Sequence, residues 1–355
     1  MKSMRRAAVV AATALTSLVL AACGGTGTAT SGSTTGEAPG TSGTTDAPTT
    51  EPAGEAPAGG EQVKIGITQI VDHPSLNAAR DGFKDALADA GYDVTYDEQN
   101  AQGDQSIAAS IAGNFAADSD MDLVLAVATP TAQAAAQAIT DIPVLFTAVT
   151  DPVSASLVDS NEAPGANVTG TSDKNPVKEQ LELLLQLDPD VQTVGIVYSS
   201  AEENSFVQVE WAEEAAAELG LTIETATIGN SSELLQATES LDVDAYYVPT
   251  DNTVVGALET LLGVAEARQV PVIVGEGDSV ARGGVATYGM SYYALGYQTG
   301  EMAVKVLTAE ADPATTPVET QSELELYLNL GAAERMGVTI PQELVDQAKP
   351  ENITE

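Results

Sequence analysis

The residues of this chain that could do chemistry are polar side chains that follow short apolar runs. They are Gln69, His73, Thr129, Thr150, Asp251, Asn252 and Asp278. Hydroxyl groups at a helix start bind anions together with free backbone N–H groups, and a carboxylate that is shielded from water binds a cation. This set of residues therefore suits the binding of a small polar molecule.

Composition excludes several other kinds of site. The 355 residues include one His and one Cys and carry a formal net charge of −39. Such a chain has no disulfide framework, no His/Cys zinc site and no Cys-His pair, and its charge argues against nucleic acid and anionic membrane surfaces as partners. The acidity is spread along the chain and is interpreted as a solvated surface suited to salt. Phosphate-loop, dinucleotide, nucleophile-elbow and zinc-protease motifs are absent, so neither an enzyme nor a cofactor nor a metal is expected.

The N-terminus is typical of an export signal. Basic residues precede an apolar stretch over 7–20, which is too short for a comfortable membrane span, and Leu20-Ala-Ala-Cys23 follows. The pattern resembles a bacterial lipobox and predicts removal of residues 1–22 and acylation of Cys23; a plain secretory signal is the alternative. Residues 23–61 are rich in Gly, Thr, Ser, Ala and Pro and are predicted to form a disordered tether.

From Val63 onward, short β-rich runs alternate with amphipathic helical stretches, which predicts an α/β fold of doubly wound parallel sheets. The order repeats. Gly66 corresponds to Gly195, 122–129 to 244–250, and 142–146 to 270–274. We therefore expect two similar lobes. In such sheets ligands bind beyond the carboxyl ends of the strands, so the polar loops should converge on one cleft if the lobes face each other.

Several segments carry a specific resemblance. GITQIVDHPSLNAARDGF, VATPTAQAAA, IPVLFTAVTDPVSASLV, YVPTDNTVVGALE and VPVIVGEGDSVARGGVATYGMSYYALGYQTGEMAVKVL are similar to the substrate-binding lipoproteins of ABC importers of the tryptophan/tyrosine type, over about 63–348. The resemblance implies a type I periplasmic-binding-protein fold, with two lobes joined by three crossovers. The expected first lobe comprises 62–170 and 291–312, and the second comprises 171–290 and 313–348, with a tail over 349–355. Simple sequential halves remain the alternative.

An amino acid ligand, which this family implies, needs partners for its carboxylate and its ammonium group. We assign the carboxylate to Thr129 and Thr150, and the ammonium to Asp251 first and Asp278 second. Helix capping is the alternative role for each of these residues.

Other loop residues are weaker candidates for ligand contact. Asn204 and Ser205 begin a helix, Gln69 and His73 follow the first strand, and Asn252 follows Asp251. Ser172 lies at the presumed first crossover and is either a hinge or a ligand residue. Aromatic side chains near strand ends or the crossover could stack on the ligand, although core packing is the commoner role: Phe146, Tyr198, Tyr247, Tyr292 and Tyr293.

The sequence thus predicts a lipid-anchored, extracytoplasmic substrate-binding protein of an ABC importer. It would capture a small solute, preferably Trp, Tyr or Phe, by hinge closure, and deliver it to a permease and, through the permease, to an ATPase. Two alternatives stay open. These are a ligand-sensing receptor or adhesin of the same fold and an importer component for another solute. Clustered carboxylates such as Glu276 and Asp278 could do acid-base work, but without a catalytic motif no enzyme is expected.

Overall fold

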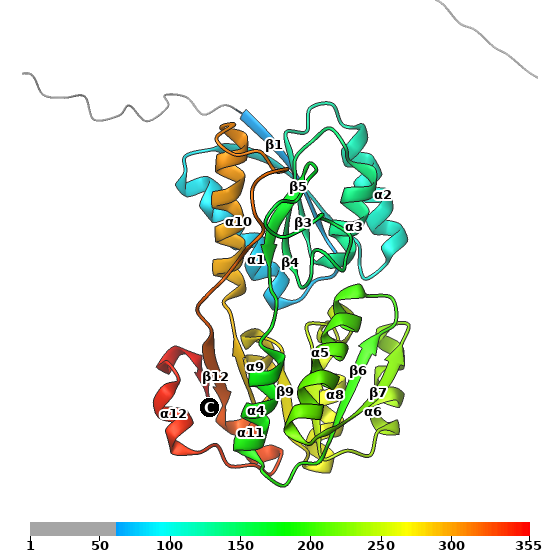
Figure 1. Ribbon diagram of the computed structural model, residues 1–355, viewed down its shortest axis with the longest axis vertical. Helices are drawn as coiled ribbons and strands as arrows, with labels where there is room; N and C mark the ends of the chain where they lie inside the picture. The colour runs from blue at the N-terminus through cyan, green and yellow to red at the C-terminus, as the bar shows by residue number, and fades with distance from the viewer. Residues whose placement is uncertain (1–61) are drawn as a thin grey trace, which may run out of the picture. The chain divides into compact units, whose positions relative to one another are not determined.

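The computed structural model describes residues 62–355, which form two α/β lobes, each around its own sheet and its own hydrophobic core (Figure 1). The expected fold class is confirmed. The first lobe contains β1 (Gln62–Gln69), α1 (Pro74–Asp89), β2 (Asp93–Asn100), α2 (Gln105–Ala117), β3 (Leu123–Val127), α3 (Thr129–Ala138), β4 (Val144–Val149), β5 (Val168–Ser172), α10 (Tyr292–Leu307) and β11 (Glu319–Thr320).

The second lobe is built in the same way, with an added C-terminal part. It contains α4 (Val177–Leu187), β6 (Thr193–Ser199), α5 (Glu203–Leu219), β7 (Thr222–Ile228), α6 (Leu234–Ser240), β8 (Ala245–Val248), α7 (Asn252–Val255), α8 (Leu258–Arg268), β9 (Val272–Val274), α9 (Gly277–Arg282), β10 (Ala286–Gly289), β12 (Glu325–Asn329), α11 (Leu330–Arg335), α12 (Gln342–Gln347) and β13 (Ile353–Thr354).

The order of strands puts the chemistry-bearing loops at one edge of each sheet. The first sheet runs β11-β5-β4-β3-β1-β2 with all neighbours parallel, and the second runs β13-β12-β10-β9-β8-β6-β7, in which only β10 and β12 are antiparallel. All residues of β3 and β4 are buried, as expected for central parallel strands covered on both faces.

Helices cover both faces of the first sheet, α1 and α10 on one side and α2 and α3 on the other (Figure 1). Glycines let α1 and α10 approach closely. A Cβ atom added at Gly296 would lie 1.8 Å from the carbonyl oxygen of Ala79, and one at Gly82 would lie 2.1 Å from that of Tyr293. Because α10 follows the second lobe in sequence, this contact fixes the returning chain to the first lobe.

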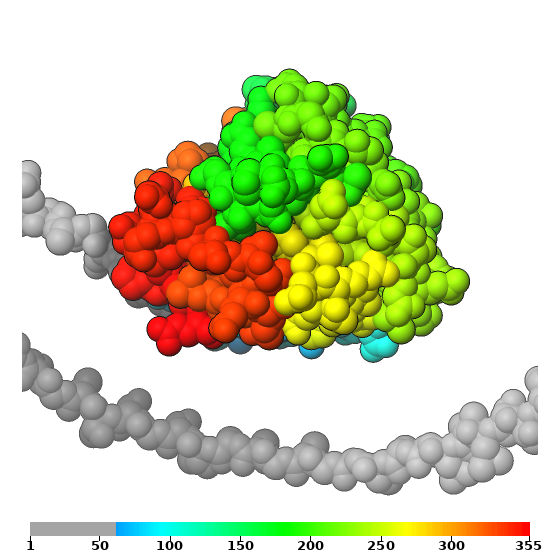
Figure 2. Space-filling view, turned by 90° about the horizontal axis from the view of Figure 1, so that it is seen from below, coloured from blue at the N-terminus to red at the C-terminus, as the bar shows by residue number. Residues whose placement is uncertain are grey.

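Three crossovers connect the lobes, at residues 173–176, 290–291 and 321–324. The third boundary was wrong in the sequence analysis, which placed it at 312. The short polar strand β11 pairs with β5 and keeps the chain on the first sheet up to Thr320. The expected tail was also wrong, because β13 pairs with β12 and belongs to the second sheet. Figure 2 shows the C-terminal residues, in red, beside the green and yellow parts of the second lobe.

The predicted signal sequence, Cys23 and the tether lie outside the described residues. Within 62–355, no helix has the length and apolar character needed to cross a membrane.

Candidate functional site

A small cavity of about 10 Å³ lies between the two lobes. Its walls come from the first lobe, the first crossover and the second lobe: His73, Ser75, Leu76, Ala148, Asp173, Asn204, Thr250, Asn252, Val255, Glu276 and Tyr292. Most of these residues follow the carboxyl ends of β1, β5, β6, β8 and β9, where the fold rule places ligands.

Buried polar atoms without a hydrogen-bond partner gather around this cavity. Within residues 62–355 they are Thr68 Oγ1, Gln69 Oε1, both ring nitrogens of His73, Ser75 Oγ, Thr129 Oγ1, Asp173 Oδ1 and Asn204 Oδ1. Four of the seven residues line the cavity directly. Since an unpaired buried polar group is costly, such a cluster indicates groups that a ligand completes.

The turn from β3 into α3 is strained. Ala128 has φ 81° and ψ 157°, a conformation that residues other than glycine seldom adopt. The hydroxyl of Thr131 donates to the carbonyl oxygens of Val127 and Ala128 at 2.6 and 3.0 Å and supports the turn. The turn starts α3 at Thr129, whose own hydroxyl makes no capping bond. Thr129 is buried and does not line the cavity, so its assignment to a ligand carboxylate stays a prediction.

Asp173 joins two crossovers at the cavity. It lies in the first crossover, and its Oδ2 accepts a hydrogen bond of 2.5 Å from the hydroxyl of Tyr292, which follows the second. Its other oxygen is unpaired and the residue is buried. Burial raises the pKa of Asp173, because few groups replace the lost hydration of its charge. From the sequence, both Asp173 and its neighbour Ser172 are hinge or ligand candidates at this crossover, and of the two only Asp173 lines the cavity.

The acidic loop after β9 presents Glu276 to the cavity, whereas the predicted Asp278 is partly exposed and lines a different surface hollow. Both oxygens of Glu276 lie 3.1 Å from the backbone N–H of Ser279, whose hydroxyl also donates to it. Burial raises the pKa of Glu276, and the nearby Asp278 carboxylate adds to the effect. Asp278 was therefore the wrong carboxylate of this loop.

The preferred ammonium partner, Asp251, does not line the cavity. Its Oδ2 accepts from the backbone N–H of Ser199 at 2.6 Å and from the hydroxyl of Ser205 at 2.7 Å, and its Oδ1 accepts from the N–H of Val254 at 2.8 Å. These bonds cap α7 and tie it to β6 and α5 within the second lobe. These bonds favour the capping alternative for Asp251, and neither Asp251 nor Ser205 lines the cavity.

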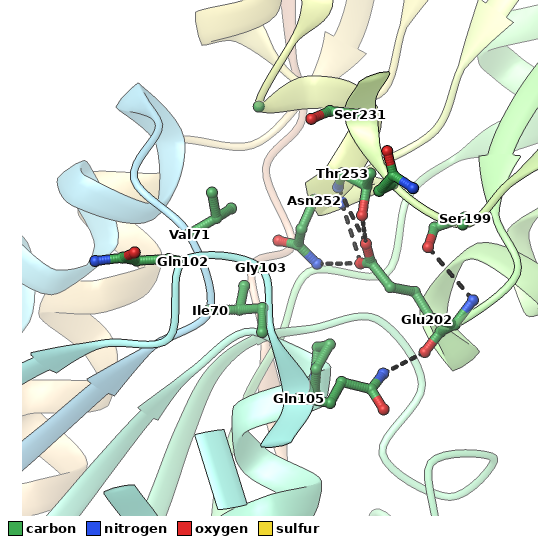
Figure 3. A pocket seen from close by; sticks show the side chains of 15 residues that line it. Ile70, Val71, Gln102, Gly103, Gln105, Ser199, Glu202, Ser231, Asn252 and Thr253 are labelled. Carbon is green, nitrogen blue, oxygen red and sulfur yellow. Dashed lines mark hydrogen bonds between the residues drawn. The ribbon is translucent and has the colours of Figure 1, made fainter. Parts of the chain in front are cut away.

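Glu202 organises the outer part of the cleft, a larger hollow of about 180 Å³ (Figure 3). Its carboxylate accepts from the backbone and side-chain amides of Asn252 and from the N–H and hydroxyl of Thr253. Across the cleft, the side-chain amide of Gln105 in the first lobe donates to the carbonyl oxygen of Ala201 in the second (Figure 3). The lobes therefore touch at the mouth of the cleft.

The remaining predicted residues fall into two groups. Asn204, Asn252 and His73 line the cavity. Gln69, Thr150 and Ser172 are buried close to the strand ends but do not line it. The Thr150 hydroxyl lies 3.5 Å from that of Thr250 across the lobes, and the Ser172 hydroxyl donates to the carbonyl oxygen of Thr150.

Sequence reasoning missed Ser75, Thr250 and Glu202. Thr250 immediately precedes the selected Asp251, so the correct strand end was identified with the wrong residue. Of the aromatic candidates, only Tyr292 lines the cavity; Phe146 and Tyr247 are core residues, Tyr198 is half-buried, and Tyr293 is exposed. Among the described residues, no group of three or more His, Cys, Asp or Glu side chains is arranged to hold a metal ion.

Comparison with known families decides the identity of this two-lobed architecture. Residues 64–351 match the family described as ABC transporter substrate binding protein. The chain belongs to this family. As a family member it binds a small-molecule substrate in an extracytoplasmic setting, and the resemblance seen in the sequence is confirmed.

Three relatives of this substrate-binding protein are informative. A tyrosine-binding protein from Clostridioides difficile is 42% identical over 76% of this chain and 79% of its own. The ABC domain in complex with L-Trp from Streptococcus pneumonia is 38% identical, covers 83% of this chain and 100% of its own, and has a TM-score of 0.79. The ligand-free, open structure of a substrate binding protein with adhesive properties from Clostridium difficile is 42% identical, covers 82% and 98%, and has a TM-score of 0.62.

The order of the two TM-scores is the opposite of the order of sequence identity. The more identical relative, in its open state, superposes less well than the less identical relative that contains L-Trp. A different arrangement of lobes explains this order. Together with the contacts between Gln105 and Ala201 and between Thr150 and Thr250, it indicates that the substrate-binding protein has its lobes closed here.

Proposed function

We propose that this protein captures an aromatic amino acid in the cavity between its lobes and delivers it to an ABC permease. The observation that carries the proposal is the enclosed cavity with its unpaired buried polar atoms. The named ligands of the two relatives, tyrosine and L-Trp, support the aromatic class.

Each charged group of an amino acid has a suitable partner. The unpaired Oδ1 of Asp173 would accept from the ammonium group, which would supply the positive charge that this buried carboxylate lacks. The ligand carboxylate would lie near the N-terminus of α3, where Thr129 Oγ1 is unpaired and the helix dipole favours an anion. Leu76 and Val255 offer apolar surface to the side chain.

Closure makes these pairings stronger, because the cavity excludes water and lowers the local dielectric. Ligand binding would therefore favour the closed population, and docking on a permease with ATP-driven opening would release the ligand. The chain would be held near the membrane by acylated Cys23 and the tether that follows it. Two or more acyl chains anchor a protein stably.

A role in adhesion is a second candidate, favoured by one observation. The 42%-identical open relative is described as a substrate binding protein with adhesive properties. Adhesion would use the outer surface and leave the cavity unchanged, so the two functions are compatible.

Isothermal titration calorimetry tests the ligand class. The protein is unfolded, washed free of bound ligand, refolded and titrated with each of the twenty amino acids. We expect heat and a thermal shift with at least one of tyrosine, tryptophan and phenylalanine. Absence of both signals with all three would refute the aromatic assignment.

Mass spectrometry of the membrane fraction, with Cys23→Ala as control, tests acylation.

A further inference from the structure

His73 is a buried polar residue that the protein itself leaves unpaired. It directly precedes α1 and has extended backbone angles, φ −154° and ψ 160°, but its side chain makes no capping bond to the helix. It is 7% exposed and lines the cavity, and neither ring nitrogen has a partner among residues 62–355. Helix capping therefore does not explain an imidazole at this position.

The imidazole is neutral in this setting. Burial lowers the pKa of His73 to about 4. The side chain of Asn252 is near enough to act in the opposite direction but makes no hydrogen bond of good geometry with the ring; the charge of Arg282 lowers the pKa further and Asp72 raises it. A neutral imidazole has one N–H donor and one nitrogen acceptor. His73 can thus accept from a ligand O–H or N–H, or donate to a ligand oxygen.

The surroundings of His73 point to the side-chain end of the ligand. Ser75, two residues further on, has an unpaired buried hydroxyl, and Leu76 and Val255 provide apolar wall. The charged groups assigned above lie on other elements, Asp173 in the first crossover and Thr129 at α3. Leu76, Ala148 and Val255 are the aliphatic residues of the wall, and Leu76 lies one turn after His73 in α1. An aromatic ring that packs on Leu76 would bring a polar ring substituent near the imidazole.

We propose that His73 determines specificity by hydrogen-bonding a polar group on the ligand's ring, so that the site favours the phenol of tyrosine or the indole N–H of tryptophan over phenylalanine. This inference rests on the proposed function. Phenylalanine would fill the same space but leave the imidazole, and the Ser75 hydroxyl beside it, buried without a partner. Sites built to hydrogen-bond a substrate group reject the analogue that lacks it.

The first test uses the wild-type protein and varies only the ligand. Refolded, ligand-free protein is titrated calorimetrically with tyrosine, tryptophan and phenylalanine. We expect the better of tyrosine and tryptophan to bind at least about tenfold more tightly than phenylalanine, the effect of one unsatisfied buried polar group. If phenylalanine binds as tightly as the better ligand, this inference fails and the proposed function stands. If none of the three binds, the proposed function and this inference both fail.

The second test varies the protein. His73→Phe keeps a ring of similar shape but removes both nitrogens, and should reduce the preference over phenylalanine to less than about threefold, mainly by weakening the preferred ligand. His73→Gln, which retains a donor and an acceptor, should recover part of the preference. Asp72→Asn, an exposed neighbour, serves as the matched control and should leave the preference unchanged. An equal loss for all three ligands in His73→Phe, or an unchanged preference, would overturn the assignment.

Discussion

The two lobes contribute different kinds of polar groups to the cleft. Within 62–355, five of the seven residues with unpaired buried atoms belong to the first lobe, one to a crossover, and only Asn204 to the second lobe. The second-lobe rim is equally polar, but its carboxylates are already paired: Glu202 with Asn252 and Thr253, and Glu276 with Ser279. The carboxylates of the second-lobe rim thus already have hydrogen-bond partners within the protein, whereas most of the unpaired polar groups belong to the first-lobe rim.

This difference suggests an order of events. A ligand gains most by first occupying the rim whose hydrogen-bonding groups are unpaired, which is the first lobe together with Asp173. The preorganised second rim then closes over it as a rigid cover, because the bonds of Glu202 and Asp251 fix the start of α7 before any ligand arrives. Substitution of Asp251 should affect mainly the stability of the second lobe, and substitution of Asp173 should affect mainly ligand binding.

The largest effect is expected for Asp251→Ala. The change leaves the N–H groups of Ser199 and Val254 and the hydroxyl of Ser205 without their acceptor in a buried place. We expect a loss of about 3 kcal/mol in the free energy of unfolding, measured with urea, while the folded variant binds ligand within about threefold of wild type. Asp242→Ala, at an exposed site in the same lobe, is the control. Loss of binding by a fully folded variant would restore Asp251 as the ammonium partner.

Asp173→Asn should have the next largest effect, and on binding. Removing the charge that faces the ammonium group should weaken affinity by about 100-fold, as for a hydrogen bond to a charged group. The ligand-free variant should unfold at the same or a higher temperature than wild type, because the buried, unpaired charge is gone and Tyr292 keeps an acceptor. Calorimetry and thermal denaturation measure the two quantities. Unchanged affinity would exclude Asp173 as the ammonium partner.

The contrast between Asp251 and Asp173 shows how far the sequence leads. Alternating runs and the internal repeat predicted two α/β lobes, and the strand-end rule predicted loops that line the cavity, because both follow from periodicity and topology. The ligand role of Thr129 stays a prediction. Which carboxylate faces the cavity depends on whether backbone N–H groups already engage it. Those N–H groups come from residues distant in sequence, such as Ser199 for Asp251.

The third crossover was missed for a related reason. β11 has two residues, Glu319 and Thr320, and neither is apolar, so no periodic pattern marks it. It exists because β5 offers an unpaired edge at Thr171 and Ser172. A strand held mainly by its neighbour has no signal of its own in the sequence.

Thr129→Val tests the first-lobe rim and should change affinity less than Asp173→Asn does. The hydroxyl of Thr129 has no partner in the protein, so an isosteric apolar residue should leave stability unchanged or slightly increased. Affinity should fall about tenfold if this hydroxyl donates to the ligand carboxylate. Thr131→Val is the contrasting variant, because that hydroxyl bonds to Val127 and Ala128 and its loss should lower stability. Equal affinity of Thr129→Val and wild type would place the carboxylate elsewhere.

The smallest effect is the pH dependence of binding. Burial raises the pKa of Asp173 in the ligand-free protein, and an ammonium group beside it would lower that pKa again, so binding releases a proton wherever Asp173 is still protonated. Affinity should therefore fall on acidification, by no more than about tenfold per pH unit, the limit for release of one proton.

The stability of the ligand-free protein should change in the opposite direction. A carboxyl group whose pKa is raised by folding adds stability at pH values below its unfolded pKa, and this stability is lost as the pH rises through the folded pKa. Asp173 and Glu276 both have raised pKa values, so their contribution favours the folded state at acidic pH. In Asp173→Asn the pH dependence of affinity should disappear, whereas in Thr129→Val it should persist. A pH-dependent affinity that survives Asp173→Asn would assign the proton to another group, with Glu276 the first to test.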